Sequence, residues 1–513
     1  GGAYATVLQL ASYRGDETVV ADLLNRGANP NVQGGKHQTA LQAALYRDCF
    51  EAVKLLLENG AQTNIDLATS ILQQASENGA DEVVQIVLER GVDLNATGGG
   101  KYGTALQSAA YANHLEIAKI LLAHGADPNV QGGMHSTPLQ EAAARGNLEL
   151  LKELLHFGAD PNIGVDYHGG PLHAAACLKP EAASQFIEIL HANGADINIQ
   201  NVHGQTALLL SSRNGHLETV QLLIEKGADV NIQDGYFGSA LQAACSIGHL
   251  AIFKTLLQHG ADIHIEGKEY GAILQAASYG GQLEIVDILL EMGVDPNAIG
   301  TLLAFCPALQ GSCRIQGGKH MTALQAACYK AHINIVKLLL KNGADPNIAG
   351  GKSGSALADA AYMCNLEIVE TLLEKGADVN FQGGDYHTAL QAACMGGDQG
   401  IVEMLLEKGA DVNSQGGYYC TALQAACRSG VRDIVEMLLK KGAAVNTQGG
   451  YYCTALQAAC AEQREAIVKA LLEWGADPNI WGGRYNTAYQ AASESRNNTI
   501  KQMLKEWGAK TDL

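Results

Sequence analysis

The sequence predicts an all-α solenoid of about fifteen helix–turn–helix units joined by glycine-turned fingers. A leucine in the phrase TALQAA and its variants recurs along the whole chain, mostly at steps of 33 residues. Each recurrence is followed by two stretches with apolar residues at helical spacing and then by a glycine-rich turn. A fixed period of about 20–50 residues is typical of stacked supersecondary units, so we expect one continuous array.

The units fill the chain from end to end. Their equivalent leucines are Leu8, Leu41, Leu72, Leu106, Leu139, Leu172, Leu208, Leu241, Leu274, Leu324, Leu357, Leu390, Leu423 and Leu456, and Tyr489 takes this place in the last unit. The steps that differ from 33 are 31, 34, 36 and 50 residues. Removing residues 299–315 from the longest step restores the period. We therefore predict repeats 1–9 at residues 1–298, an insertion at 299–315, and repeats 10–15 with a polar C-terminal cap at 316–513.

Each unit predicts the same elements in the same order. The Thr of TALQAA is a helix N-cap, and the alanines after it allow close packing of the first helix. A second helix follows, as in residues 433–439, where the apolar residues have helical spacing. The Gly of KGADVN ends that helix in the left-handed conformation, and Asp, Pro and Asn form the turn. An extended QGGxY finger leads to the next Thr.

This order of elements at a 33-residue period resembles the ankyrin repeat. The family's T-P-L-H-x-A motif is closest at Thr137-Pro138-Leu139-Gln140 and Pro171-Leu172-His173, and its GHLE motif is present at residues 215–218. Two features differ from the family pattern. Gln replaces His after the leucine in 12 of 15 units, and a row of Gln amides can bridge neighbouring fingers. In the finger, the family normally has Gly two residues before the Thr. Here the GG pair lies earlier in the finger, and an aromatic residue or His occupies the position two before the Thr.

The GGxYxTALQAA style resembles the ankyrin arrays of filamentous fungi. Such arrays often follow an NTPase or another signalling module, and the resemblance implies that this chain is a recognition arm. The first unit begins in mid-finger at Gly1-Gly2 without a polar cap, so we expect a further segment before it.

Composition narrows the class of partner and the compartment. The formal charge is −19, with 34 Lys+Arg against 53 Asp+Glu, so a large nucleic-acid-binding face is not expected. No run of about 18 apolar residues predicts a membrane span. The 12 cysteines contain no C-x-x-C pair, and the 16 histidines form no ligand cluster, so we predict no metal and no cofactor. Five cysteines directly follow QAA and read as small buried hydrophobes in a reduced, cytoplasmic protein.

Tyrosines gather at two positions of the repeat that should face a concave groove. The position five after the leucine, on the first helix, holds Tyr13, Tyr46, Tyr111, Tyr279, Tyr329 and Tyr362. The position two before the Thr, on the finger, holds Tyr4, His37, Tyr102, His135, His168, Phe237, Tyr270, His320, Tyr386, Tyr419, Tyr452 and Tyr485. Tyrosine is enriched at binding surfaces. The irregular helix set favours binding, whereas the regular finger set favours a structural ladder, with Tyr386, Tyr419 and Tyr452 kept as candidates.

Two carboxylates interrupt the alanines on the predicted groove floor. Glu141 and Asp359 stand two after the leucine, and beside Asp359 the Gln row is broken by Ala358. An apolar floor could raise the carboxyl pKa and let it hold a cationic or hydroxyl group. A solvated side chain in an open groove is the alternative that we favour.

The insertion at 299–315 has two interpretations. It is rich in apolar residues, which favours a lid over the groove, but 17 codons also keep frame and fit a translated intron.

These observations predict a non-enzymatic scaffold that binds a protein or peptide, with Lys or Arg favoured by the net charge. Repeats ten and eleven, with Tyr329, Tyr362 and Asp359, form the expected contact region. The alternative is an enzyme that encloses a small molecule or a cationic intermediate between the aromatic groove and the insertion, with Asp359 or Glu141 as acid or base. A pure spacer is the third possibility.

Overall fold

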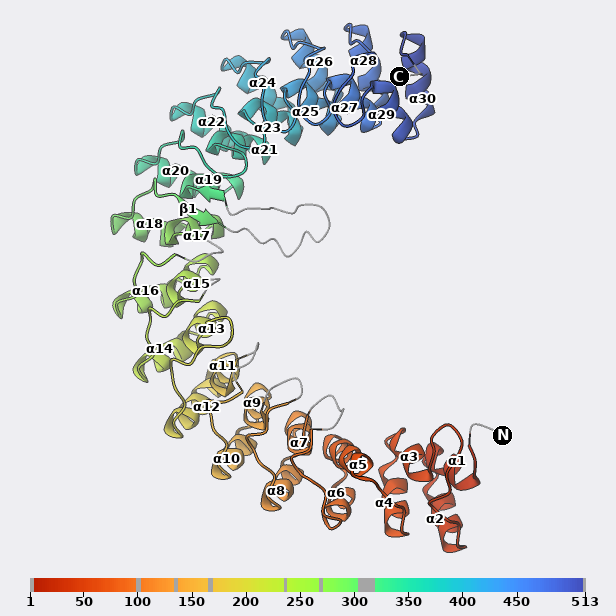
Figure 1. The fold of residues 1–513 in the computed structure, drawn as a ribbon. Coiled ribbons are helices and arrows are strands. Elements are labelled where there is room, and N and C mark those ends of the chain that lie inside the picture. Colours follow the sequence, from red (N-terminus) through yellow and green to blue (C-terminus); the bar gives the residue numbers. More distant parts are fainter. Residues whose placement is uncertain are drawn as a thin grey trace. The chain divides into compact units, whose positions relative to one another are not determined.

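The computed structural model describes residues 4–97, 103–132, 137–164, 169–234, 238–266, 271–302 and 319–510, with only the backbone described at 301, 302, 319 and 320. The chain forms two compact units, Gly1–Asp234 and Gly235–Leu513. Within each unit the odd-numbered helices form one row and the even-numbered helices a second (Figure 1). We call these rows the inner and outer helices.

The first unit carries seven helix pairs in the part that the structure describes. They are α1 (Val7–Arg14), α2 (Glu17–Asn25), α3 (Ala40–Leu45), α4 (Phe50–Glu58), α5 (Ile65–Asn78), α6 (Asp81–Leu88), α7 (Ala105–Ala112), α8 (Leu115–Ala123), α9 (Pro138–Ala144), α10 (Leu148–His156), α11 (Pro171–Ala176), α12 (Pro180–Ala192), α13 (Ala207–Asn214) and α14 (Leu217–Glu225).

The second unit continues the same alternation through its described residues. Its helices are α15 (Ala240–Ile247), α16 (Leu250–Gln258), α17 (Ile273–Gly280), α18 (Leu283–Glu291), α19 (Ala323–Tyr329), α20 (Ile333–Lys341), α21 (Ala356–Tyr362), α22 (Leu366–Glu374), α23 (Ala389–Gly396), α24 (Gln399–Glu407), α25 (Ala422–Ser429), α26 (Arg432–Lys440), α27 (Ala455–Ala461), α28 (Glu465–Glu473), α29 (Ala488–Glu494) and α30 (Asn498–Glu506). The all-α fold class is confirmed.

The repeat motif places small side chains between neighbouring inner helices. In α25, Ala425, Ala426 and Cys427 are fully buried, and α25 packs between α23 and α27. The outer helix α26 buries Ile434 and Val435 against the same layer. Each unit therefore buries its apolar face on its neighbours, which is how a solenoid is stabilised.

The predicted Thr N-cap is present on inner helix α25, and the predicted left-handed glycine follows outer helix α26 at Gly442, with φ 88°. Thr421 accepts a hydrogen bond from the Gln424 N–H at 3.2 Å, and Gly430 ends α25 in the left-handed conformation with φ 87°. Helix α17 differs, because its N-cap Ala272 has no side-chain acceptor.

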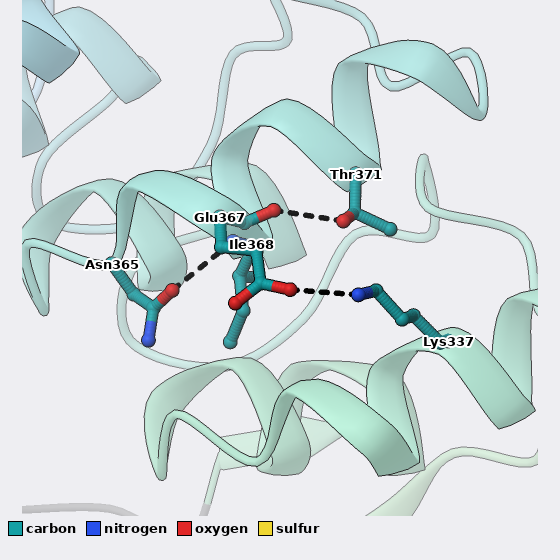
Figure 2. A network of polar contacts seen from close by, with 5 residues as sticks. All are labelled: Lys337, Asn365, Glu367, Ile368 and Thr371. Carbon is teal, nitrogen blue, oxygen red and sulfur yellow. Dashed lines mark hydrogen bonds and ion pairs between the residues drawn. The ribbon is translucent and has the colours of Figure 1, made fainter.

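Polar contacts on the outer row tie adjacent repeats together, as Figure 2 shows for α20 and α22. Asn365 caps α22 by accepting from the Ile368 N–H at 3.1 Å. One turn later the Thr371 hydroxyl donates to the Glu367 carbonyl, and the Glu367 carboxylate binds Lys337 of α20 at 2.7 Å.

The predicted bridging by the Gln row is confirmed. The Gln424 Nε2 donates to the carbonyl oxygens of Thr447 at 3.2 Å and Cys453 at 2.9 Å, both in the next finger. The Gln391 and Gln457 amides repeat this pattern one repeat earlier and one repeat later. The Cys453 carbonyl also accepts from the Gly449 N–H at 2.9 Å within its finger, so the Gln424 amide adds a second hydrogen bond there and links α25 to the next finger.

The third repeat lacks a finger. Helix α5 begins directly after Asn64, whose side chain accepts from the Leu67 N–H at 2.8 Å, and it is 14 residues long. The extended first turn of α5 takes the place of the finger, which explains the short step of 31 residues. Gln42, one repeat earlier, accordingly makes no amide bond to a finger carbonyl in the described structure.

Fingers contribute little regular strand in the described residues. In the later repeats each finger closes with a single antiparallel bridge, such as Gly416 with Cys420. Strands β1 (Gly300–Leu302) and β2 (Lys319–Met321) pair antiparallel, with Gly300 opposite Met321. Most of the predicted insertion at 299–315 falls outside the described residues, so both its interpretations stay open.

Candidate functional site

The two tyrosine positions lie on one face of the stack, as the sequence predicted. The Tyr13 and Tyr46 rings on the inner helices lie 5.1 and 4.7 Å from the His37 ring on the finger between them. In the second unit the Tyr362 ring stacks on the Tyr386 finger ring at 4.8 Å and 24°. We call the surface formed by these helix and finger positions the inner face.

Two of the predicted finger tyrosines are mainly structural. Tyr419 and Tyr452 are only 8% and 4% exposed. The Tyr452 hydroxyl donates to the Glu462 carboxylate at 2.6 Å. Burial, and to a smaller extent this hydrogen bond, raises the pKa of the Tyr452 phenol. Tyr386 is less buried than these two tyrosines, and its ring stacks on that of Tyr362. The other finger aromatics of the middle repeats (102, 135, 168, 237 and 270) fall outside the described residues.

The helix tyrosines keep more exposed surface. Tyr46 is 63% exposed, whereas Tyr13, Tyr111, Tyr279, Tyr329 and Tyr362 are partly covered. Tyr279 packs on Met321 and Ala326 of the next repeat. The inner face is therefore partly filled by its own contacts.

Cations of the chain itself lie over several of these rings, a feature that the sequence reading missed. Arg47 lies 5.4 Å from the centre of Tyr13 and Arg145 lies 3.9 Å from that of Tyr111. In both pairs the cation comes 34 residues after the tyrosine, one position after the equivalent tyrosine site of the next repeat. A search for Lys or Arg at this offset could have found them.

The same pairing crosses the insertion. Lys330 lies 4.3 Å from the centre of Tyr279 and 5.9 Å from that of Tyr329. The 51 residues that separate Tyr279 from Lys330 equal the usual 34 plus the 17-residue insertion. At Tyr362 the offset falls on Gly396, and within the described part of the chain no cation lies over this ring.

Glu141 is not a solvated side chain, so the interpretation that we favoured is wrong for it. It is 3% exposed and binds the Arg145 Nε at 2.9 Å. That guanidinium also stacks on Tyr111, and hydrogen bonds to Glu141 and Tyr111 raise the pKa of Arg145. The three side chains join repeats four and five, which leaves this carboxylate no exposed face for a substrate.

Asp359 is also buried, and here too the solvated interpretation is wrong. It is 1% exposed, because the finger loop at Gly351 and Ser353 closes over it. Ser353 hydrogen-bonds the carboxyl, but Oδ2 has no hydrogen-bond partner among the residues that the structure describes. Burial, opposed by this hydrogen bond, raises the pKa of Asp359 to about 7, as the sequence suggested for a carboxylate on an apolar floor.

A surface cavity of about 490 Å³ lies between the loops of repeats eight and nine. It is lined by Ile263, His264, Glu266, Ala272, Ile273, Met292, Gly293, Val294, Asp295 and Ala298. Neither Asp359 nor Glu141 lines it, so it is not the pocket that the enzymatic alternative required. In the described residues no group of three or more His, Cys, Asp or Glu side chains could hold a metal ion.

Comparison with known proteins identifies the family. Models for ankyrin repeats in three copies match residues 8–98, 98–165, 139–234, 235–300, 301–383 and 378–449. A model for many copies matches 212–257 and one for a single ankyrin repeat matches 451–482. Because these matches span most of the sequence, the chain belongs to the ankyrin repeat family.

The human ASB11 ankyrin repeat domain is similar to part of the chain. Its crystal structure shares 24% sequence identity with a TM-score of 0.38, over 47% of this chain and 98% of that one. No curated protein matches. Ankyrin repeats generally mediate protein–protein interaction, and none of the matched models describes a catalytic family. Across the described helices, none is long and apolar enough to cross a membrane.

Proposed function

We propose that the chain is a non-enzymatic scaffold that holds a protein or peptide partner against its inner face, and that repeats ten and eleven form a main contact. The observation that carries this proposal is the Tyr362–Tyr386 stack. These rings lie 4.8 Å apart at the surface, and Tyr362 has no cation of the chain over it in the described residues.

A partner with Lys or Arg side chains suits this stack. A guanidinium or ammonium placed over the face of Tyr362 would gain a cation–π contact that the chain already forms at Tyr111 and Tyr279. The net charge of −19 attracts a basic segment most strongly at low ionic strength. The partner interaction should therefore weaken as ionic strength rises.

The compartment and the wider architecture belong to the same proposal. The ten described cysteines are free thiols, five of them buried directly after QAA, which fits a reduced cytoplasmic protein. As in fungal arrays of this repeat style, we propose that the chain is the recognition arm of a larger signalling protein.

The test is the double variant Tyr329→Ala with Tyr362→Ala. A partner is recovered with the unchanged chain, and its affinity is then measured by calorimetry. We expect the double variant to lose about 2 kcal/mol or more of binding free energy, as aromatic anchors usually do. The melting temperature should change little, because both rings keep exposed surface.

The control is Trp474→Ala, which removes an exposed aromatic side chain at the end of outer helix α28. It should bind normally. Equal losses in the control and the double variant, or a double variant that melts several degrees lower but binds normally, would refute the site.

A further inference from the structure

The first two repeats carry three cations that face the inner surface without an ion-pair partner. Arg14, Lys36 and Arg47 are exposed, and none of them pairs with a carboxylate in the part of the chain that the structure describes. In other repeats Arg145 of this face is paired with Glu141 at 2.9 Å and Arg428 lies 3.6 Å from Glu462, whereas Lys330 forms no ion pair in the described residues.

Lys36 and Arg47 lie against a cluster of four aromatic rings, and Arg14 interacts electrostatically with Tyr4 of the same cluster. Tyr4, Tyr13, His37 and Tyr46 form a cluster with neighbouring ring centres 4.7–6.2 Å apart. Arg47 lies 5.4 Å from the centre of Tyr13, while Lys36 lies 6.0 Å from that of Tyr46.

The arrangement pre-organises positive charge. A guanidinium that stacks on a ring loses less side-chain entropy when it binds an anion, and its edge N–H groups stay free for carboxylate oxygens. The nearest acidic side chains in sequence, Asp16 and Asp48, follow the inner helices and form no ion pair with these cations in the described structure.

We propose that the inner face of repeats one and two binds an acidic peptide segment, whose carboxylates contact Arg14, Lys36 and Arg47 and whose backbone crosses the exposed Tyr46 ring. The proposal rests on the function given above, in that the inner face is the binding surface. It adds a second contact of opposite charge preference on the other unit.

An acidic peptide fits better than a nucleic acid. A nucleic acid carries a phosphate at every nucleotide, and the three cations could neutralise only a few of them. The chain as a whole is acidic, with a net charge of −19, and would repel the remaining phosphates. A short acidic segment needs only local complementarity, because exposed charges more than about 8 Å away are largely screened at physiological salt.

The test uses the full chain and a fluorescein-labelled peptide of alternating glutamate and glycine, with the matching glutamine peptide as the uncharged probe. Binding is followed by fluorescence anisotropy. We expect the glutamate peptide to bind and the glutamine peptide not to bind. Lys36→Glu with Arg47→Glu should weaken binding by about tenfold or more, because rejection of like charge adds to the lost attraction.

Two further variants separate this site from general charge effects. Arg26→Glu with Lys152→Glu makes the same charge change on the outer helices and should leave binding unchanged. Tyr46→Ala should weaken binding, whereas Tyr46→Phe, which keeps the ring, should not. Circular dichroism of each variant confirms that the stack is intact.

Several results would overturn the inference. These are equal losses in the inner and outer charge variants, equal binding of the two peptides, or tighter binding of a thymidine oligonucleotide than of the glutamate peptide. If the glutamate peptide fails while the Tyr329 and Tyr362 variant still loses its partner, only this inference falls. If that variant keeps its partner while the glutamate peptide binds, only the proposed contact at repeats ten and eleven falls.

Discussion

At the residue scale, the buried carboxyl of Asp359 is the clearest local anomaly. It replaces the alanine that most repeats carry two positions after the leucine, and in the described structure its Oδ2 has no hydrogen-bond partner. A buried ionised carboxylate with an unsatisfied oxygen destabilises a fold. The neutral form is therefore favoured in the folded protein, and burial raises the pKa to about 7 from the ordinary value of 3.8.

The consequence is a stability that depends on pH. Between pH 3.8 and about 7 the folded chain holds this proton and the unfolded chain does not. The free energy of unfolding should therefore fall as pH rises through this window and level off above it. We expect Asp359→Asn to remove this part of the dependence and to stabilise repeats ten and eleven at pH 8 by about 2–4 kcal/mol.

Thermal unfolding of both proteins from pH 5 to 8 checks this prediction. Asp287→Asn, at an exposed position of outer helix α18, is the control and should follow the unchanged chain at every pH. A constant difference between Asp359→Asn and the unchanged chain across the range would contradict a titrating Asp359.

At the element scale, the Gln row connects each inner helix to the next finger. Gln424→Ala removes the side-chain donor from the Thr447 and Cys453 carbonyls, of which the Cys453 carbonyl keeps the Gly449 N–H at 2.9 Å and the Thr447 carbonyl loses its donor. A buried acceptor that loses its partner costs about 1–3 kcal/mol, so the variant should unfold at lower urea concentration. Gln42→Ala is the matched control, because Gln42 has no such bonds in the described structure, and it should lose much less. Similar losses in both variants would mean that the amide bridges contribute nothing.

The uncapped helix α17 gives a prediction of the opposite sign. Ala272 has the extended conformation of an N-cap, with φ −75° and ψ 161°, and it borders the surface cavity. Ala272→Thr should supply the missing acceptor and raise stability by about 1 kcal/mol. Ala272→Val has the same shape without the hydroxyl, so a thermal melt in which both variants gain equally would assign the effect to cavity filling.

At the scale of the whole molecule, the 50-residue step is the longest interruption of the period. Strand β1 lies within the predicted insertion and pairs with β2 after it, while the Gln275 amide donates to carbonyls on both sides of the insertion, those of Ala298 at 2.7 Å and Met321 at 3.4 Å. Helix α17 also packs directly on α19. The stack therefore continues between repeats nine and ten without requiring the inserted residues.

Deletion of residues 299–315 should accordingly preserve the fold, with unchanged helix content by circular dichroism. Stacked repeats depend on contacts with their nearest neighbours, and the deletion restores the 33-residue period. Partner affinity then separates the two interpretations: a loss supports a lid, and an unchanged affinity supports a translated intron. A large drop in helix content would show that the segment is part of the fold.

The sequence by itself determined the local architecture of this ankyrin repeat protein. Thr421, Gly430 and the alanines between them specify a capped helix through contacts within a few residues, and the 33-residue period repeats that result along the chain. The periodicity also placed the helix and finger aromatics on one face, because equivalent positions of a stack point the same way.

Only the tertiary structure decided which of those side chains are available. Burial of Asp359 depends on a finger loop that closes over it, and burial of Glu141 accompanies its bond to Arg145. The cations over Tyr13 and Tyr111 come from the next repeat, 34 residues later. Exposure and pairing on this face depend on contacts between neighbouring repeats, and no local sequence pattern specifies how closely two repeats approach each other.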